Sequence, residues 1–381
     1  MSLTDSVIQQ IKERKLRLEK GEVNSIPSPF QRFSNDFIGI EQSTYYLITS
    51  FTKGGKSQFT SYIFIFKALL WAYYSKSNTK LTILYFPLEE TKERIMQRFM
   101  SFLLCEFTNG EYVISPSQLR SSKNDSPCPK EVIDLLESDE IQDILRYFES
   151  NVIFFNEDNP TGIYKVCRQY AEDNGKVHYK KGKYRDELGQ IQETDVFDYY
   201  EPNNPNEYKL IVIDTINIIN TERGLTLKQS IDKLSEYLSK YLRNRYGFSP
   251  VVIQQQNTDS ENNEAVKMGR VRPTIAGLAD SKYTARDCNV ALGLFSPFRF
   301  GLKEYLGYDI TKFKDSIRFL EVLVNRDSTM GGIVALHFNG AVSHFNELPL
   351  PNDERELRRV YESLKPKEKS KLFLIISKFI K

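Results

Sequence analysis

Ser50-Phe-Thr-Lys-Gly-Gly-Lys-Ser57 is the part of the sequence that is most informative about the fold. It matches the phosphate-binding pattern G-x-x-x-x-G-K-[ST] except at the first position, where serine replaces glycine. Periodicity predicts an apolar strand before it, over residues 45–49, and a helix after it, over residues 57–74. This strand–loop–helix setting makes the motif more specific than a Gly-Lys-Ser triplet alone. The alternative is an ordinary glycine turn that caps a helix.

Each residue type in this loop suits the binding of phosphate. Main-chain N–H groups surround the phosphates, and the helix N-terminus adds partial positive charge. Glycines let the main chain approach closely. The lysine is expected to reach the β- and γ-phosphates, and the last hydroxyl to bind Mg²⁺. The predicted ATP-binding residues are Ser50, Thr52, Lys53, Gly54, Gly55, Lys56 and Ser57.

Carboxylates follow two other predicted strands. Asp214 follows the apolar residues 210–213, where an aspartate is costly to bury without a partner. A magnesium shell is such a partner, and the capping of a helix is the alternative. Glu89 and Glu90 follow the strand at residues 81–86. Either glutamate could polarise an attacking water or cap the next helix, so the residues alone leave that choice open.

The order of strands and helices predicts an α/β fold. Between residues 45 and 255, strands that are apolar throughout alternate with helices, which is typical of a parallel sheet covered on both faces. After residue 289 strands follow one another without helices, and Gly331-Gly332 and Asn339-Gly340 mark hairpin turns. We therefore predict a central, mostly parallel sheet flanked by helices, with an antiparallel C-terminal extension.

Three segments lie outside this pattern. Residues 1–28 are predicted to form a helical arm that docks on its own domain or on a neighbouring subunit. The main domain is predicted over residues 29–350, with a polar surface insertion at about 174–208 that contains a hairpin. Residues 351–381 are expected to form a tail that is charged at first and then apolar and basic.

Composition excludes some classes of function. The 381 residues carry a formal net charge of +2, so only a local patch would attract nucleic acid. Four cysteines without a C-x-x-C pair, together with three histidines, argue against a zinc site. No signal peptide is expected, and the longest apolar run is too short to span a bilayer. We expect a cytoplasmic protein with no membrane partner.

The order of the motifs resembles the ATPase domain of DnaB-type replicative helicases, in the RecA superfamily. The resemblance extends over about residues 1–347, and in this family a small residue often stands at the first position of the phosphate loop. The other matching segments are Pro87-Leu-Glu-Glu90, Leu210-Ile-Val-Ile-Asp-Thr215, Pro250-Val-Val-Ile-Gln-Gln-Gln-Asn257, Arg272-Pro273, Leu278-Ala-Asp-Ser281, Arg286-Asp287, Asn325-Arg326, His337-Phe-Asn-Gly340 and His344-Phe345.

The resemblance implies a RecA-like P-loop core and a role for each residue. It favours Glu89 over Glu90 as the catalytic base, and it gives Asp214 a share of the magnesium bound by Ser57. Gln256, with Gln255 as the second choice, would sense the γ-phosphate. Arg326 would be an arginine finger that acts in trans on the nucleotide of the next subunit.

The resemblance also implies cofactors and partners. These are ATP, Mg²⁺, single-stranded DNA and further copies of the chain in a ring that is expected to be hexameric. Lys267, Arg270 and Arg272 lie in the loop at residues 258–276, whose cations suit a nucleic-acid backbone, although a solvated loop is the alternative. A second basic cluster, at residues 176–185, is more typical of a solvated surface.

The sequence departs from the family at several points. The family's N-terminal helical domain, which receives primase, is expected to be missing, so a link to primase or other replisome proteins stays open. Val324 or Asn325 stands where the family has a lysine beside the finger. Such a compact chain suits a bacteriophage acting in a bacterial host. The leading hypothesis is an ATP-dependent replicative DNA helicase. The alternatives are a recombinase-like or clock-type ATPase that controls assembly without unwinding, and a non-catalytic nucleotide-binding regulator.

Overall fold

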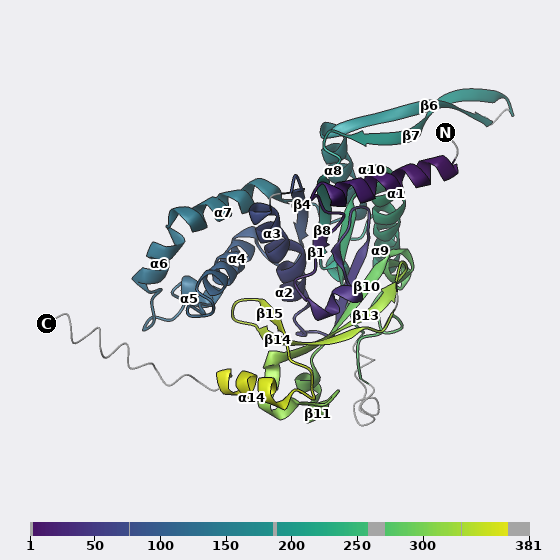
Figure 1. The fold of residues 1–381 in the computed structure, drawn as a ribbon. Helices are drawn as coiled ribbons and strands as arrows, with labels where there is room; N and C mark the ends of the chain where they lie inside the picture. The colour runs from purple at the N-terminus through teal and green to yellow at the C-terminus, as the bar shows by residue number, and fades with distance from the viewer. Residues whose placement is uncertain (1–2, 76, 186–188, 258–270, 329, 365–381) are drawn as a thin grey trace.

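The structure, a computed structural model, describes residues 3–75, 77–185, 189–257, 271–328 and 330–364. A nine-stranded sheet forms the centre of this part of the chain, in the order β15-β14-β13-β10-β3-β9-β8-β4-β5 (Figure 1). Its strands are β3 (Tyr46–Ser50), β4 (Lys80–Pro87), β5 (Val152–Phe154), β8 (Glu207–Asp214), β9 (Ser249–Gln255), β10 (Val290–Phe295), β13 (Ile317–Asn325), β14 (Ile333–Asn339) and β15 (His344–Glu347).

The sheet is parallel on one side and antiparallel on the other. All neighbours from β5 through β10 are parallel. From β10 onward, β13, β14 and β15 pair antiparallel. Every residue of β3 and β8 is buried, as expected of strands covered on both faces. The predicted α/β class with an antiparallel C-terminal extension is therefore confirmed.

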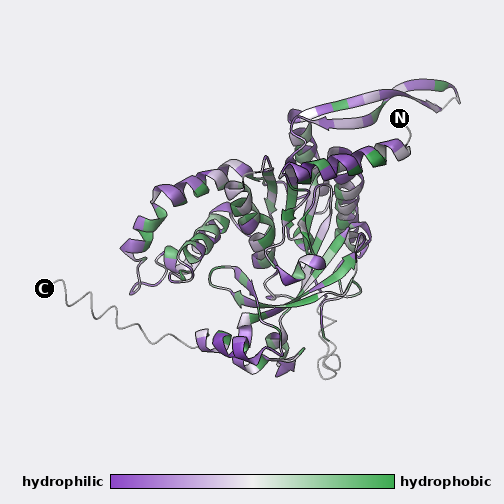
Figure 2. Ribbon diagram, in the orientation of Figure 1, coloured by the Kyte–Doolittle hydropathy of each residue, from purple (hydrophilic) through white to green (hydrophobic). Residues whose placement is uncertain are grey.

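Helices cover both faces of the sheet. In β8, Leu210 and Val212 belong to the core on one face, whereas Ile211 and Ile213 belong to the core on the other. Figure 2 shows the apolar residues gathered in the sheet and on the inner sides of these helices. The first face carries α2 (Lys56–Thr60), the π-helical segment η2 (Ser61–Lys67), α3 (Ala68–Tyr74), α4 (Lys92–Phe107) and α7 (Asp139–Asn151), and the second carries α8 (Pro160–Asp173), α9 (Leu227–Glu236), the π-helical segment η4 (Tyr237–Arg243) and α10 (Asn244–Tyr246).

A third, smaller core lies beyond the antiparallel strands. Phe319 of β13 and Ala335 of β14 pack there with Leu357 of the C-terminal helix. The sequence analysis predicted no elements between residues 297 and 316, yet short ones line this core. They are η6 (Pro297–Phe300), β11 (Glu304–Tyr305), β12 (Tyr308–Asp309), α13 (Ile310–Phe313) and η7 (Lys314–Ser316), and the C-terminal helix is α14 (Glu354–Ser363).

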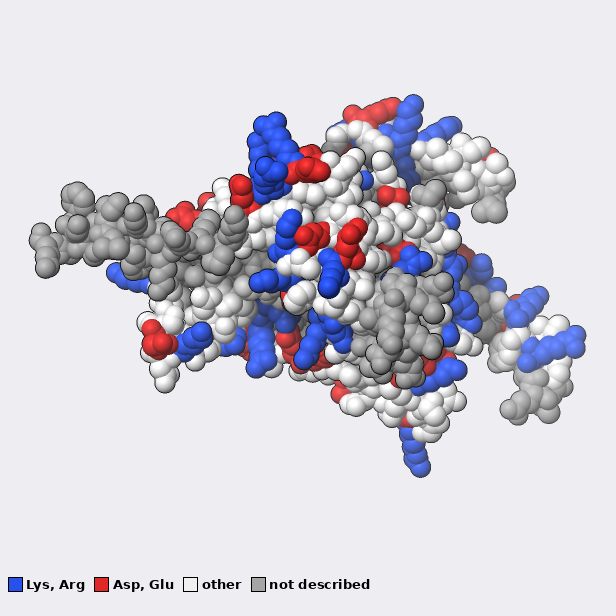
Figure 3. All heavy atoms as spheres, turned by 90° about the horizontal axis from the view of Figure 1, so that it is seen from below, with Lys and Arg blue, Asp and Glu red and all other residues white. Residues whose placement is uncertain are grey.

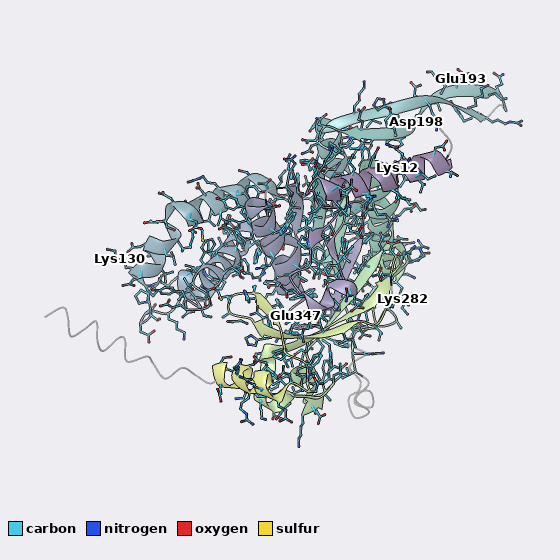
Figure 4. The ribbon with its side chains drawn as sticks, in the orientation of Figure 1. Lys12, Lys130, Glu193, Asp198, Lys282 and Glu347 are labelled. Carbon is cyan, nitrogen blue, oxygen red and sulfur yellow. The ribbon has the colours of Figure 1, made fainter. Side chains whose placement is uncertain are left out.

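Two elements project at the end of the molecule away from α14. One is α1 (Leu3–Glu19), and the other is the hairpin of β6 (Gly175–Arg185) and β7 (Ile191–Pro202) (Figure 1). Lys12 on α1 and Asp198 on β7 mark this end in Figure 4. The hairpin lies within the expected insertion, although β8 already begins at Glu207. The predicted domain boundaries near residues 28 and 350 stay predictions.

The remaining elements are short and lie around the core. None of the described helices is long and apolar enough to cross a bilayer. They are β1 (Ile26–Pro27), which pairs with β2 (Gly39–Ile40), and η1 (Arg32–Asn35), α5 (Pro116–Leu119), α6 (Lys130–Leu136), η3 (Ile216–Ile218) and α12 (Tyr283–Asp287).

Candidate nucleotide-binding site

The predicted site residues gather where the parallel strands end. The register pairs Ser50 at the end of β3 with Gln255 at the end of β9. It also pairs Asp214 at the end of β8 with Pro87 at the end of β4. All four positions are therefore at one edge of the sheet, the carboxyl edge, where open α/β sheets bind ligands.

The phosphate loop has the tight main-chain path that its sequence predicts. Its main chain turns back when the Gly54 N–H donates to the Phe51 carbonyl, at 3.0 Å. Gly55 has a φ of 98°, which favours glycine. A Cβ on Gly54 would lie 1.9 Å from the Ser50 hydroxyl. The serine that replaces the first glycine thus packs against Gly54, and a side chain on Gly54 would require the Ser50 hydroxyl to move.

Lys56 is the first residue of α2 and is buried, with 8% of its surface exposed. Its ammonium makes no hydrogen bond or ion pair with any described residue. A cation that is mostly removed from water is costly unless an anion joins it. The position at a helix N-terminus adds a further preference for negative charge. Lys56 is therefore arranged to receive an anionic ligand.

Asp214 is the buried carboxylate of the site. The Ser57 hydroxyl donates to its Oδ1 at 2.9 Å, and the Tyr85 hydroxyl donates to its Oδ2 at 3.3 Å. Burial raises the pKa of Asp214 to about 6; the hydrogen bond from Ser57 opposes this, and the charge of Glu89 adds to it. A carboxylate held in this way gains from a nearby cation.

Ser57 and Asp214 have the chemistry to hold Mg²⁺. This ion prefers oxygen ligands, and it commonly takes one or two from the protein and the rest from phosphates and water. The Ser57 hydroxyl and the Asp214 carboxylate are both oxygen donors, and their 2.9 Å separation lets one ion contact both. The residues present therefore fit the predicted metal.

The structure distinguishes the two glutamates that follow β4. Glu90 forms an ion pair with Arg98 of α4. Glu89 is exposed and makes no hydrogen bond or ion pair with the described residues, while its charge acts on Asp214. Glu89 is therefore the carboxylate that stays available for a water molecule.

The two candidate glutamines point to different sides at the end of β9, which finishes with Gln255. Gln256 is fully buried, and its amide donates to the Thr49 hydroxyl at 2.8 Å and to the Thr274 carbonyl at 3.0 Å. Gln255 donates to the hydroxyl of Thr52 in the phosphate loop. Successive side chains of a strand point to opposite faces, so only one of the pair can face the loop. Gln255, the second choice from the sequence, is the one in contact with it.

Arg326 lies at the opposite edge of the sheet. It follows Asn325, which pairs with Val290 in β10, and Val290 in turn pairs with Tyr46 at the start of β3. Its exposed guanidinium donates to the carbonyl of Arg286 and forms no ion pair with a described residue. The structure thus does not bring Arg326 to the phosphate loop of its own chain.

Of the three predicted DNA-contacting residues, the structure describes only Arg272. Lys267 and Arg270 lie outside the described residues. Arg272 is half exposed and forms an ion pair with Glu321 of β13 at 3.4 Å, so part of its charge is neutralised. Figure 3, which views the molecule from below, shows basic side chains spread over this face with acidic ones among them.

Sequence reasoning missed Arg318, the second residue of β13. Its side chain is fully buried, and its Nε donates to the carbonyl of Gly54 in the phosphate loop at 2.8 Å. The signal was an arginine inside an otherwise apolar stretch, Ile317-Arg-Phe-Leu320. A charged residue there needs partners inside the protein, but the sequence does not say which.

Comparisons with known proteins identify the fold. No family model and no curated protein sequence matches this chain. The solved structure of a DnaB-like replicative helicase, reported with its interactions with primase, aligns with a TM-score of 0.61 at 14% identity, covering 91% of this chain and 66% of that one. A second solved structure, that of an ATPase domain alone, aligns with a TM-score of 0.59 at 14% identity, covering 91% of this chain and 99% of that one.

The chain therefore has the RecA-like α/β fold of a DnaB-type ATPase domain, as the motif order predicted. It spans less than two thirds of the length of the DnaB-like helicase. Identity of 14% establishes the fold only, so the activity has to be argued from the site.

Proposed function

We propose that this chain is a Mg²⁺-dependent ATPase that assembles into a ring, moves along single-stranded DNA and unwinds duplex DNA. The observation that carries the proposal is the set of groups at the carboxyl edge of the sheet. Lys56 is a buried cation without a described partner, and Ser57 and Asp214 are adjacent oxygen donors. Glu89 is an exposed carboxylate with no hydrogen bond or ion pair to the described residues. Phosphoryl transfer to water needs a phosphate cradle, a cation site and a base in this arrangement.

Each residue has a distinct task in this proposal. The phosphate loop and Lys56 bind and orient the phosphates. The metal, held by Ser57 and Asp214, neutralises phosphate charge when bound. Glu89 orients the attacking water and accepts its proton. Gln255 contacts the loop through Thr52 and is well placed to respond to the γ-phosphate, so we assign it the sensing role in place of Gln256.

Arg326 supports action between subunits. It lies at the sheet edge opposite to its own phosphate loop, with a guanidinium free of ion pairs to described residues. An arginine finger stabilises the charge of the transition state, so Arg326 would serve the nucleotide of a second copy. In α1, Ile11 is 62% exposed and Leu18 is 59% exposed, which suits docking of the arm on a neighbour. A closed ring, which we propose to be a hexamer, would use both contacts.

The proposed DNA contacts are Lys267, Arg270 and Arg272. Arg272 lies near the carboxyl end of β3. It pairs with Glu321 of β13, which lies opposite Gly293 of β10. Gly293 in turn aligns with Thr49 of β3. Rings of this kind concentrate a few cations per subunit in one channel, which compensates for a chain of low net charge. A phage-infected bacterial cell as the setting, and other replisome proteins as partners, stay predictions.

The test compares wild type with Glu89→Gln on a forked DNA duplex. Wild type is expected to unwind the fork with ATP and Mg²⁺, whereas Glu89→Gln is expected to bind ATP and DNA without unwinding. DNA-stimulated hydrolysis without unwinding would favour a recombinase-like or clock-type ATPase. Binding of ATP without any hydrolysis by wild type would favour a nucleotide-binding regulator.

A further inference from the structure

Arg318 is a buried guanidinium that the proposed reaction does not explain. Only 1% of its surface is exposed, and it is the largest fully buried side chain in the described part of the chain. Removing such a cation from water costs several kcal/mol unless most of its N–H groups find acceptors. It therefore matters which acceptors Arg318 uses.

Its partners come from two places. Near it in sequence, Nη1 donates to the carbonyls of Asp315 and Ile317, at 2.7 and 2.9 Å, and Nη2 pairs with the Asp315 carboxylate at 3.0 Å. Far from it in sequence, Nε donates to the Gly54 carbonyl at 2.8 Å. The guanidinium also lies over the ring of Phe338, at 4.5 Å. The Nε hydrogen bond is the one that reaches the phosphate loop.

The phosphate loop needs such a contact. Gly54 and Gly55 adjoin in the loop, and paired glycines have more main-chain freedom than any other residues. A loop that directs its N–H groups at phosphate leaves its carbonyls to find other donors, and a buried carbonyl without one is costly. Gly54 is itself buried, so Arg318 supplies a donor that water cannot easily replace.

We propose that Arg318 is a positioning residue for the phosphate loop. Its Nε–H holds the Gly54 carbonyl, so the main chain of the loop is set for phosphate before the nucleotide arrives. Binding then avoids the entropic cost of ordering two glycines. The proposal rests on the proposed nucleotide site, and it adds a residue from β13 that no part of the loop motif contains.

The test measures ATP hydrolysis by Arg318→Lys and Arg318→Met. Lysine keeps the charge near Asp315 but has no donor at the Nε position, and methionine removes both charge and donor at similar volume. Losing a charge-assisted hydrogen bond to the loop is expected to raise KM for ATP about tenfold. Because the loop binds substrate and transition state alike, kcat at saturating ATP is expected to stay within about twofold of wild type.

Asp315→Asn is the matched control. The Asp315 carboxylate touches the same guanidinium, but its side chain is 67% exposed and it does not contact the loop. Asparagine keeps a side-chain oxygen that can accept from Nη2, so KM is expected to change by less than about twofold. Thermal unfolding without nucleotide shows whether each variant folds, and Arg318→Lys decides the question if Arg318→Met does not fold.

The possible outcomes separate this proposal from the proposed function. A folded Arg318→Lys with the KM of wild type would overturn the positioning role. A kcat that falls while KM stays constant would overturn it too, because the loop would then bind substrate normally. If Lys56→Ala left ATP turnover unchanged, the nucleotide site itself would be wrong, and that result does not depend on Arg318.

Discussion

Two arginines at opposite ends of β13 differ in almost every respect. Arg318, near the start of the strand, is buried and bonded to Gly54, Asp315 and Ile317. Arg326, just past the end, is exposed and donates to one main-chain carbonyl, that of Arg286. The first lies at the edge of the sheet that holds the phosphate loop, and the second at the opposite edge. The contrast indicates that a buried, satisfied cation organises its own site, whereas an exposed one is available to another molecule.

Lys56 lies in the phosphate loop that Arg318 contacts, and its removal is predicted to have the strongest consequence. Lys56→Ala is expected to lose Mg²⁺–ATP binding below detection, because the one buried cation in the loop that has no described partner is gone. Titration with a fluorescent ATP analogue measures this, and circular dichroism checks that the fold is retained. Lys130→Ala, at an exposed lysine of α6, is the control and should bind as wild type does.

The next prediction concerns Arg326, the exposed arginine at the opposite edge of the sheet. Arg326→Ala is expected to lower ATP hydrolysis by a factor of about 10³, because an arginine finger stabilises the transition state. Nucleotide affinity and thermal stability are expected to stay at wild-type values, since Arg326 is exposed and remote from the loop. Arg359→Ala on α14, at an arginine that is also exposed, should leave hydrolysis unchanged. Weaker ATP binding by Arg326→Ala would contradict the separation of the two edges.

Asp214 offers a third contrast, because unlike Arg318 it is a buried charge that its partners do not fully satisfy. Burial is the main reason that the pKa of Asp214 is raised from 3.8 to about 6. The folded protein therefore favours the neutral carboxyl. The stability that this form contributes is complete below pH 3.8 and is lost as the pH rises through 6. Asp214→Asn avoids that loss. The free energy of unfolding without nucleotide is expected to rise by about 3 kcal/mol at pH 7.5, from a shift of about two pKa units.

Denaturant unfolding at two pH values tests whether Asp214→Asn raises the free energy of unfolding as expected. The gain of Asp214→Asn over wild type should disappear as the pH falls below 3.8, because Asp214 then becomes protonated in the unfolded state as well. Magnesium-dependent ATP binding should be lost in the same variant. A variant that is less stable than wild type at pH 7.5 would show that Asp214 is satisfied without a cation.

The smallest expected effect concerns DNA. Arg272→Ala is expected to weaken binding of single-stranded DNA only modestly and to reduce the slope of log affinity against log salt by about 1, as loss of one phosphate contact does. The change should be equal for different base sequences. Arg272 already shares its charge with Glu321, so Glu321→Gln is expected to shift the affinity in the opposite direction. An unchanged dependence of affinity on salt would show that Arg272 does not contact DNA.

Local sequence patterns were sufficient to predict most of the fold and part of the site. Strands buried on both faces, such as β8, have an apolar signal that does not depend on distant residues. The loop motif likewise places Lys56 and Ser57 within one strand–helix unit. The contact between Arg318 and Gly54 joins residues 264 positions apart, and no local pattern shows such a pairing.

Which of the two adjacent glutamines contacts the phosphate loop could not be predicted from the sequence, for a different reason. Gln255 and Gln256 are chemically identical, and their orientation depends on the register of β9 against β3. A shift of one residue exchanges the two faces of a strand, so motif alignment is not sufficient. The likeness to the two solved structures is likewise a likeness of fold, because only 14% of the aligned residues are identical.

If two copies of the chain complete each active site, as we propose, then assemblies that mix two inactive variants should regain activity. Arg326→Ala retains Glu89, and Glu89→Gln retains Arg326, so each variant alone lacks one group at every site. Mixing the two should create some sites with both groups. ATP hydrolysis in the mixture is therefore expected to be well above the sum of the separate variants. Hydrolysis no greater than that sum would contradict an arginine that acts between subunits.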